Sequence, residues 1–303
     1  MKVLTVTLNA ALDVTYRVDA LEPGATHRVS DVAVRAGGKG VNVARVLCGL
    51  GVSVVASGFC GGAAGESLRA DLARSGVPQA MFPISGETRR TVAVVGSAGE
   101  ATLFAEPGPM VTAAEWDGFL GWFGEVEADV VVLSGSLPLG VPGDAYATLV
   151  RASRVPVVLD ADGPALAAGA AAGPAVITPN RRELTAAIKS DCHEPAAASA
   201  PTLDNPLILG AEAALVSDGP LGMTLHTLDG VWTAAPPEVL AGNPTGAGDA
   251  AVAALVAAWH LPWPQRLAEA VALSAAAVRA PLAGDFDRSF YDQHRAAIVP
   301  TRL

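Results

Sequence analysis

Lysine is scarce in this 303-residue chain, which has 20 Lys and Arg residues but only three lysines, Lys2, Lys39 and Lys189. Acidic residues outnumber basic ones by 30 to 20, so the formal net charge at pH 7 is −10. Because no basic surplus is available to displace counterions, we do not expect sequence-independent binding of nucleic acid. An acidic chain that handles phosphate groups must concentrate its few cations at the site where it does so.

Cysteines and long hydrophobic runs are also rare. The three cysteines, Cys48, Cys60 and Cys192, lack metal-ligand spacing and suit a reduced cytoplasmic protein, and the five histidines form no zinc pattern. The longest uninterrupted apolar run, residues 250–259, is about half as long as a membrane span. Residues 3–8 form a short strand-like run rather than a signal peptide. We therefore expect a cytoplasmic protein with no membrane partner.

The chain does contain a regular alternation of two kinds of apolar segment. Short runs rich in Val, Leu and Ile, as in strands buried on both faces, occupy residues 3–8, 53–59, 129–133, 155–159, 175–178 and 213–217. Helical patterns separate them, at residues 40–50, 64–75, 112–126, 143–154, 164–171 and 181–190. This alternation predicts an α/β fold with a mainly parallel sheet and helices on both faces. Ligands of such sheets bind beyond the carboxyl ends of the strands, where Asn9, Ser134, Asp160, Asn180 and Asp218 fall.

Two pairs of segments interrupt this alternation. Residues 14–18 with 28–34, and 88–95 with 100–104, mix polar and apolar residues, and residues 96–99 supply a turn. Because such strands are too polar for the centre of the sheet, we predict a small β lid formed by about residues 14–35 and 88–105. Residues 191–206, rich in Ala, Pro and Ser, are expected to be a surface connection. We predict one domain that spans residues 1–303.

A glycine-rich motif opens the apolar run at residues 250–259, which is long enough for a helix. Residues 243–249 read NPTGAGD, which places small residues and Asp249 in its first turn. That turn has unpaired backbone N–H groups and the positive end of the helix dipole, so Gly246, Ala247 and Gly248 would let a phosphate approach closely. The same position should keep Asp249 ionised and able to accept a proton. The alternative is a tight turn whose acid only stabilises the helix, by about 0.3–1 kcal/mol.

A second glycine-rich motif lies near the start of the chain. Residues 36–45 read AGGKGVNVAR, so three glycines surround Lys39 at the beginning of another helix. Lysine supplies a compact, mobile charge for an anionic group, although a turn whose lysine points into water would have the same sequence. The motif is not a Walker loop, because neither Ser nor Thr follows Lys39. The sequence also lacks a dinucleotide-binding fingerprint after the first strand and a nucleophile elbow.

Together, the two motifs resemble the signatures of the ribokinase-like (PfkB-type) carbohydrate kinases. Five further segments follow in family order: 7–13 (TLNAALD), 86–89 (GETR), 106–109 (EPGP), 134–138 (SGSLP) and 179–184 (PNRREL). Within the family, they are most similar to the branch of 1-phosphofructokinase and tagatose-6-phosphate kinase. The resemblance implies a three-layer α/β/α sandwich with a small β lid, and ATP-dependent phosphoryl transfer to a sugar hydroxyl.

For the substrate, the resemblance implies a set of binding residues on the lid, the helix start and one turn: Asp13, Arg28, Gly38, Lys39, Asn42, Arg89 and Ser136. In this interpretation, Asp13 accepts hydrogen bonds from sugar hydroxyls, while Lys39 and Arg89, with Arg28, grip a phosphate that the sugar already carries. Other interpretations remain open: Asp13 or Ser136 as a turn residue, and Arg89 as the solvated end of a strand.

For the nucleotide, the resemblance implies contacts from loop residues that include several glycines: Asn180, Ser217, Gly219, Gly222, Thr245, Gly246 and Gly248. Asn180 and Glu183 match the family's Asn-x-x-Glu, which organises Mg²⁺ and its waters around the ATP phosphates. The alternative for this pair is a capping box at the start of a helix. Thr178 stands where relatives usually carry a lysine, which removes a cation near the nucleotide phosphates.

In the implied reaction, Asp249 takes the proton of a hydroxyl that attacks the γ-phosphate of ATP, and N–H groups of Ala247, Gly248 and Asp249 stabilise the developing charge. The best single acceptor is fructose 1-phosphate, converted to fructose 1,6-bisphosphate. Tagatose 6-phosphate, fructose 6-phosphate, an unphosphorylated sugar or a nucleoside are alternatives, and a sugar-phosphate sensor is a non-enzyme alternative that Thr178 leaves open. Exposed edges of the lid strands suggest a homodimer paired through the lid.

Overall fold

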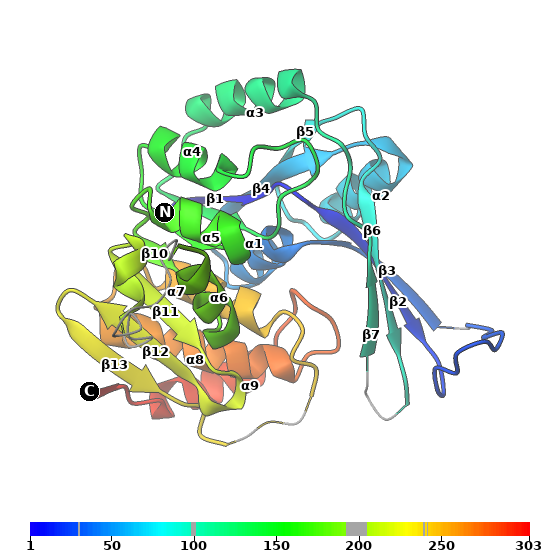
Figure 1. The fold of residues 1–303 in the computed structure, drawn as a ribbon. Helices are drawn as coiled ribbons and strands as arrows, with labels where there is room; N and C mark the ends of the chain where they lie inside the picture. Colours follow the sequence, from blue (N-terminus) through cyan, green and yellow to red (C-terminus); the bar gives the residue numbers. More distant parts are fainter. Residues whose placement is uncertain (30, 98–100, 192–204, 239, 241) are drawn as a thin grey trace.

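A ten-stranded sheet runs through the described part of the chain, which comprises residues 1–303 without 30, 98–100, 192–204, 239 and 241 in this computed structural model. The strand order is β14-β13-β12-β11-β10-β9-β8-β1-β4-β5 (Figure 1). The strands that pair in parallel are β1 (Lys2–Thr7), β4 (Ser53–Cys60), β5 (Gln79–Pro83), β8 (Val130–Ser134), β9 (Val157–Asp160), β10 (Val176–Ile177) and β11 (Ala213–Ser217). An antiparallel edge follows, formed by β12 (Met223–Thr227), β13 (Gly230–Ala234) and β14 (Thr301–Arg302).

Helices cover both faces of this sheet (Figure 1). One face carries α1 (Lys39–Gly49), α2 (Gly62–Arg74), α7 (Ala247–Ala257), α8 (Trp263–Val278) and α9 (Arg288–His294). The other carries α3 (Ala113–Glu125), α4 (Ala145–Ala152), α5 (Gly163–Ala170) and α6 (Arg181–Asp191). Successive strand residues point to opposite faces, so Val130 and Val132 of β8 join one core while Val131 and Leu133 join the other. The predicted α/β fold with a mainly parallel sheet between two helical layers is confirmed.

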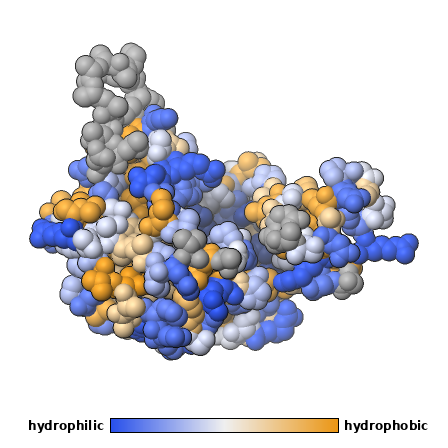
Figure 2. Space-filling model, turned by 90° about the horizontal axis from the view of Figure 1, so that it is seen from below, coloured by the Kyte–Doolittle hydropathy of each residue, from blue (hydrophilic) through white to orange (hydrophobic). Residues whose placement is uncertain are grey.

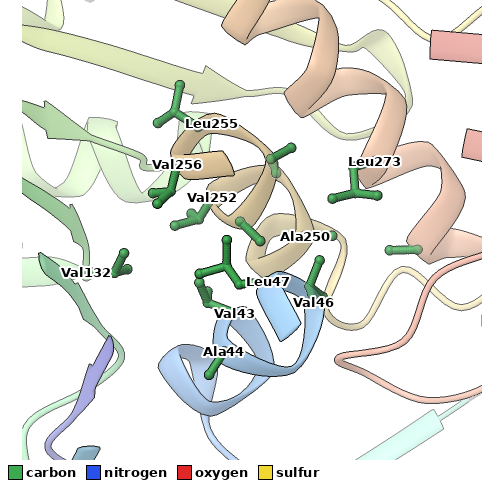
Figure 3. Close-up of a cluster of buried hydrophobic side chains, with 14 of the residues drawn as sticks. Val43, Ala44, Val46, Leu47, Val132, Ala250, Val252, Leu255, Val256 and Leu273 are labelled. Carbon is green, nitrogen blue, oxygen red and sulfur yellow. The ribbon is translucent and has the colours of Figure 1, made fainter. Parts of the chain in front are cut away.

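The packing of α1 against α7 decides where the two glycine-rich motifs lie. Figure 3 shows Val43 and Leu47 of α1 pointing toward α7, close to its Val252, and all three side chains are buried. The distance between packed helices depends on the side chains at their contact, and the alanines of α7 permit a close approach. The first turns of the two helices consequently meet, and Asn42 contacts Asp249 although 207 positions separate them.

A second sheet, with described strands in the order β3-β2-β6-β7, stands off the core as the predicted lid (Figures 1 and 2). Its strands are β2 (Ala11–Arg17), β3 (Asp31–Gly37), β6 (Arg89–Val95) and β7 (Ala101–Ala105). β2 and β6 pair in parallel, and the two outer pairs are antiparallel. Alternating side chains give the lid two faces. Asp13 and Thr15 line a cleft beneath it, whereas Val32, Val34 and Phe104 are exposed on the outside.

Several elements differ from the sequence-based expectations. β2 begins at Ala11 rather than near residue 14, and β5, β12–β14, α8 and α9 were not predicted. β12 alternates buried and half-buried residues, as expected for a strand near the edge of a sheet. The short 3₁₀ helices at Pro206–Leu209, Gly219–Leu221 and Arg295–Ala297 were also not predicted. The expected connection at 191–206 and turn at 96–99 fall largely outside the described residues.

None of the helices in the described part of the chain combines the length and the apolar character needed to span a bilayer.

Candidate active site

A cavity of about 390 Å³ lies between the lid, the first turns of α1 and α7, and the carboxyl ends of the central strands. Most of the residues singled out in the sequence meet there. Its lining consists of Asp13, Gly38, Lys39, Asn42, Arg89, Thr91, Asp160, Thr178, Asn180, Glu183, Ser217, Thr245, Gly246, Gly248 and Asp249. The two glycine-rich motifs therefore share one cavity, at the strand ends where ligands of α/β sheets bind.

Asp249 is a buried carboxyl in the first turn of α7, with only 7% of its surface exposed. Asn42 of α1 donates a side-chain hydrogen bond to its Oδ2 at 2.8 Å. Burial raises the pKa of Asp249 to about 7, and the charge of Asp160 adds to this, while the Asn42 bond and the charge of Lys39 oppose it. The sequence predicted an ionised Asp249 from its place at a helix start. Burial opposes that effect, so the carboxyl exchanges its proton near neutral pH.

Lys39, at the start of α1, lies among carboxylates of the cavity. Its Nζ is 3.2 Å from Oδ1 of Asp160 and 4.0 Å from Oε1 of Glu183. Burial alone would lower the pKa of Lys39, but the charges of Asp160, Glu183 and Asp249 raise it above its usual value. Asp160 is itself buried, which raises its pKa against the opposing effect of Lys39. The position of Asp160 at this sheet edge was predicted, but its role was not. The signal that could have found it is the single lysine of the site, because a buried lysine needs a counter-charge.

The glycine turn before α7 is open to the cavity. Gly246 caps the helix with a φ of 86°, and a Cβ built on it would lie 2.9 Å from Cα of Ala283. A Cβ on Gly248 would meet no described atom within 4 Å, so it would project into free space. The N–H of Ala247 donates to the Pro244 carbonyl at 3.2 Å. Of the three amides predicted to form a cradle, that of Ala247 is therefore already hydrogen-bonded within the turn.

Asn180 and Glu183 form the capping box that was the alternative interpretation. The N–H of Asn180 donates to Oε2 of Glu183, and the N–H of Glu183 donates to Oδ1 of Asn180, each at 2.9 Å. The second carboxylate oxygen of Glu183, Oε1, takes no part in these two bonds and faces Lys39. Helix capping and a position on the cavity wall thus coexist in the same two residues.

A neighbouring groove of about 390 Å³ continues the cavity toward the residues expected to bind nucleotide. Asn180 and Ser217 line both spaces, and Gly219 lines the groove. Gly222 lines neither of these two spaces. Its φ is 100°, and a Cβ on it would lie 2.2 Å from the Ala234 carbonyl oxygen, so the neighbouring strand β13 explains the glycine. Thr178 is on the cavity wall, with its hydroxyl 3.5 Å from the Leu159 carbonyl oxygen.

The lid contributes Asp13 and Arg89 to the cavity. Burial raises the pKa of Asp13 to about 6, against the opposing charge of Arg89. Arg89 donates from Nε to the carbonyl of Asn9 at 3.1 Å and from NH1 to the carbonyl of Glu106 at 3.3 Å. These bonds hold the guanidinium beside Asp13, so Arg89 is not the solvated end of a strand.

Two expected substrate residues do not line this cavity. Arg28 is exposed on the connection between β2 and β3. Ser136 is exposed after β8, and its Oγ accepts a hydrogen bond from Nδ2 of Asn9 at 3.1 Å. Gly38 lines the cavity, and its φ of 100° together with its closeness to the Thr7 side chain explains why glycine stands there.

Comparisons with known proteins show the family and the fold. A family model described as pfkB family carbohydrate kinase matches residues 4–286. Escherichia coli phosphofructokinase-2, in a crystal structure with fructose-6-phosphate, is similar over 98% of both chains, with 27% identity and a TM-score of 0.86. A possible 1-phosphofructokinase from Thermotoga maritima is similar over 100% of both chains, with 27% identity and a TM-score of 0.85. Ribokinase from Thermotoga maritima shares the fold, at 19% identity over 96% of this chain and 98% of its own, with a TM-score of 0.75.

The two glycines of the α7 turn provide a matched pair of variants. We expect Gly248→Ala to keep or raise the thermal midpoint, because alanine in a helix is favoured over glycine by about 0.5–1 kcal/mol. It should nevertheless weaken ATP binding, because its methyl group would enter the cavity. Gly246→Ala should lower the midpoint because of its positive φ and the contact with Ala283. Thermal unfolding and calorimetric titration with ATP measure both effects, and unchanged ATP affinity in Gly248→Ala would contradict the cradle.

Proposed function

The chain belongs to the pfkB family of carbohydrate kinases, and we propose that it transfers the γ-phosphoryl group of ATP to a hydroxyl of a phosphorylated ketohexose. The observation that carries this proposal is the buried Asp249 carboxyl, which accepts a hydrogen bond from Asn42 beside a helix start open to the cavity, and whose pKa burial raises to about 7. A general base works best when its pKa lies near the operating pH. Fructose 1-phosphate remains the best single acceptor, with fructose 1,6-bisphosphate as the product.

In the proposed reaction, ionised Asp249 takes the proton of the acceptor hydroxyl while the oxygen of that hydroxyl forms a bond to the γ-phosphorus of ATP. The bond from that phosphorus to the bridging oxygen breaks, and ADP leaves with the electron pair. The Asn42 amide fixes one oxygen of Asp249, so the other is free to face the hydroxyl. First-turn amides of α7 stabilise the charge that develops on the transferred group.

The family uses ATP with Mg²⁺, which would neutralise charge on the transferred phosphate. Glu183 has one oxygen outside its capping bonds, and Asp160 adds a second carboxylate at the cavity, so oxygen ligands of the kind Mg²⁺ prefers are present. Among the described residues, no group of three His, Cys, Asp or Glu side chains is arranged to hold a metal alone. We infer contact through water and the nucleotide phosphates, with Asn180 supporting Glu183.

The surroundings of Lys39 and Arg89 favour an acceptor that already carries a phosphate. Lys39 is paired with Asp160 and lies close to Glu183, on the side of the cavity that continues toward the nucleotide groove. Arg89 donates to carbonyl oxygens of Asn9 and Glu106 and lies near Asp13, but it forms no ion pair with a described carboxylate, so its charge can attract an anion. We therefore assign the phosphate of the acceptor to Arg89 and the transferred phosphoryl group to Lys39.

Replacing Asp249 separates chemistry from stability. We expect Asp249→Asn to lose about 10²–10⁴-fold in kcat, because a positioned base contributes that much. In the parent enzyme, kcat/KM should rise with pH and level off above about 7, as Asp249 ionises. Steady-state kinetics from pH 5.5 to 8.5, roughly spanning that pKa, measure both. Near-parental turnover in the variant would overturn the assignment.

The same variant has an opposite effect on the fold. The folded-state pKa of about 7 exceeds the ordinary value of 3.8, so the folded protein holds this proton more tightly than the unfolded chain does. Ionisation therefore costs stability as pH rises through that interval, and the full cost is present above about pH 7. Asp249→Asn should unfold at a higher urea concentration than the parent at pH 8, with the difference vanishing as pH falls toward about 4.

An ADP-release assay across acceptors tests the substrate class. We expect the highest kcat/KM with fructose 1-phosphate, a lower value with fructose 6-phosphate or tagatose 6-phosphate, and the lowest with ribose or adenosine. Arg89→Gln should raise the KM for phosphorylated acceptors by about 10–100-fold, as expected when a charge-assisted bond is lost. A preference for ribose or adenosine would contradict the assignment, and no ADP release with any acceptor would favour a sugar-phosphate sensor.

We also propose that two copies pair through the outer face of the lid. Val32, Val34 and Phe104 are 49%, 45% and 56% exposed there, and apolar residues gather on the lid that projects at the right of Figure 2. In sedimentation velocity, the parent should behave as a dimer and Phe104→Ser should dissociate at a higher protein concentration. Leu228→Ser, which changes an 86% exposed residue between β12 and β13, is the control. A parent that remains monomeric would refute the pairing.

A further inference from the structure

We propose that the ion pair between Arg35 and Asp285 fastens the lid to the segment that supports the catalytic turn, and so positions the acceptor for transfer. Arg35 is on β3 of the lid, and Asp285 follows α8 in the core. The functional part of this inference rests on the proposed kinase activity. The pair itself is defined by contacts that are independent of any substrate.

The contact is bidentate. NH1 of Arg35 lies 2.7 Å from Oδ2 of Asp285, and NH2 lies 2.9 Å from Oδ1. Two parallel bonds between a planar guanidinium and a carboxylate fix orientation as well as distance. The bond to Asp285 also raises the pKa of Arg35 above its usual value. A single charged contact would permit the lid to pivot, whereas this geometry holds it in one orientation.

On the lid, Arg35 sits beside the residue expected to bind the sugar. Arg35 of β3 lies directly opposite Asp13 of β2 in the antiparallel register. Both line a cleft of about 490 Å³ beneath the lid, which reaches across to Leu282 and Ala283 of the core. The contact between Arg35 and Asp285 therefore determines how far Asp13 lies from the core across this cleft.

On the core side, the segment before Asp285 touches the machinery around Asp249. A Cβ on Gly246 would lie 2.9 Å from Cα of Ala283, so Ala283 packs directly against the cap of α7. A Cβ on Gly284 would lie 3.3 Å from Oδ1 of Asn42, the residue that donates to Asp249. Residues 283–285 therefore contact the turn before α7, the Asn42 side chain that donates to Asp249, and Arg35 of the lid.

This arrangement has a direct consequence for the acceptor. With the pair closed, Arg35 is engaged by Asp285, and Asp13 has Thr91 and the nearby charge of Arg89 to compete with sugar hydroxyls. With the pair open, Arg35 would be released beside Asp13, its neighbour across the strand, and would compete with the sugar for that carboxylate. The side chains of Arg35 and Asp285 are 21% and 45% exposed, so water can solvate both groups once a substitution breaks the pair.

The test is a double-mutant cycle with Arg35→Gln, Asp285→Asn and the double variant. Hydrogen–deuterium exchange of residues 31–37 reports the attachment of the lid without any substrate. Steady-state kinetics report the KM for the acceptor and for ATP separately. Asp31→Asn is the matched control, because it breaks the 3.1 Å pair of Arg17 and Asp31, which joins two strands within the lid and does not reach the core.

We expect each single variant to speed exchange at residues 31–37 and to raise the KM for the sugar phosphate by about tenfold, with the KM for ATP unchanged. The double variant should be no worse than the more affected single variant, because the two residues act as one unit. The control should match the parent in exchange and in both KM values. A Tm within a few degrees of the parent value would exclude general unfolding as the cause.

Two results would overturn the inference. Unchanged exchange in both single variants would show that the pair does not hold the lid. Additive effects in the double variant, or an equal effect of Asp31→Asn, would show that Arg35 and Asp285 act separately or only through the surface charge of the lid. If the parent phosphorylates none of the acceptors, the proposed function fails, and the exchange measurement alone still decides whether the pair fastens the lid.

Discussion

The burial of the Asp249 carboxyl against Asn42 is the constraint on which the rest of the site depends. Asp249 lies on the same face of α7 as Val252 and Val256, three and seven positions later, and this face packs toward α1. The apolar packing that joins the two helices therefore also removes water from the carboxyl and supplies the Asn42 amide. Burial by itself would keep Asp249 neutral, so the amide and the nearby Lys39 are needed to bring its pKa to about 7.

The scarcity of lysine takes on a physical meaning at this cavity. Lys39 lies among Asp160, Glu183 and Asp249, so one cation faces three carboxyl groups. A nucleotide that adds several negative charges would be repelled here unless further positive charge arrived with it. The charge balance therefore supports the proposal that the nucleotide binds together with a metal ion, near the first-turn amides of α7.

The sequence predicted the fold well because the buried strands are uniformly apolar and the glycine motifs fall where helices begin. The sequence did not predict the side-chain pairs that join positions far apart in the chain. The pairing of Lys39 with Asp160 spans 121 positions and that of Arg35 with Asp285 spans 250, and neither has a local pattern. Gly222 matched a loop of the family, yet what explains this glycine is its close contact with β13. Arg28 was expected to bind substrate because it lies on the lid, but the sequence does not show that it is exposed outside the cavity. The helix start before Asp249 is visible in the sequence, but the burial that raises its pKa is not.

The most direct test of this account is a carbon-13 NMR titration of the Asp249 side-chain carboxyl in the ligand-free protein, assigned by comparison with Asp249→Asn. The account predicts a midpoint near pH 7, and a lower midpoint only when a cation binds nearby. A midpoint near the ordinary value of 3.8 would mean that the carboxyl is hydrated, and that the packing of α1 against α7 does not tune the base.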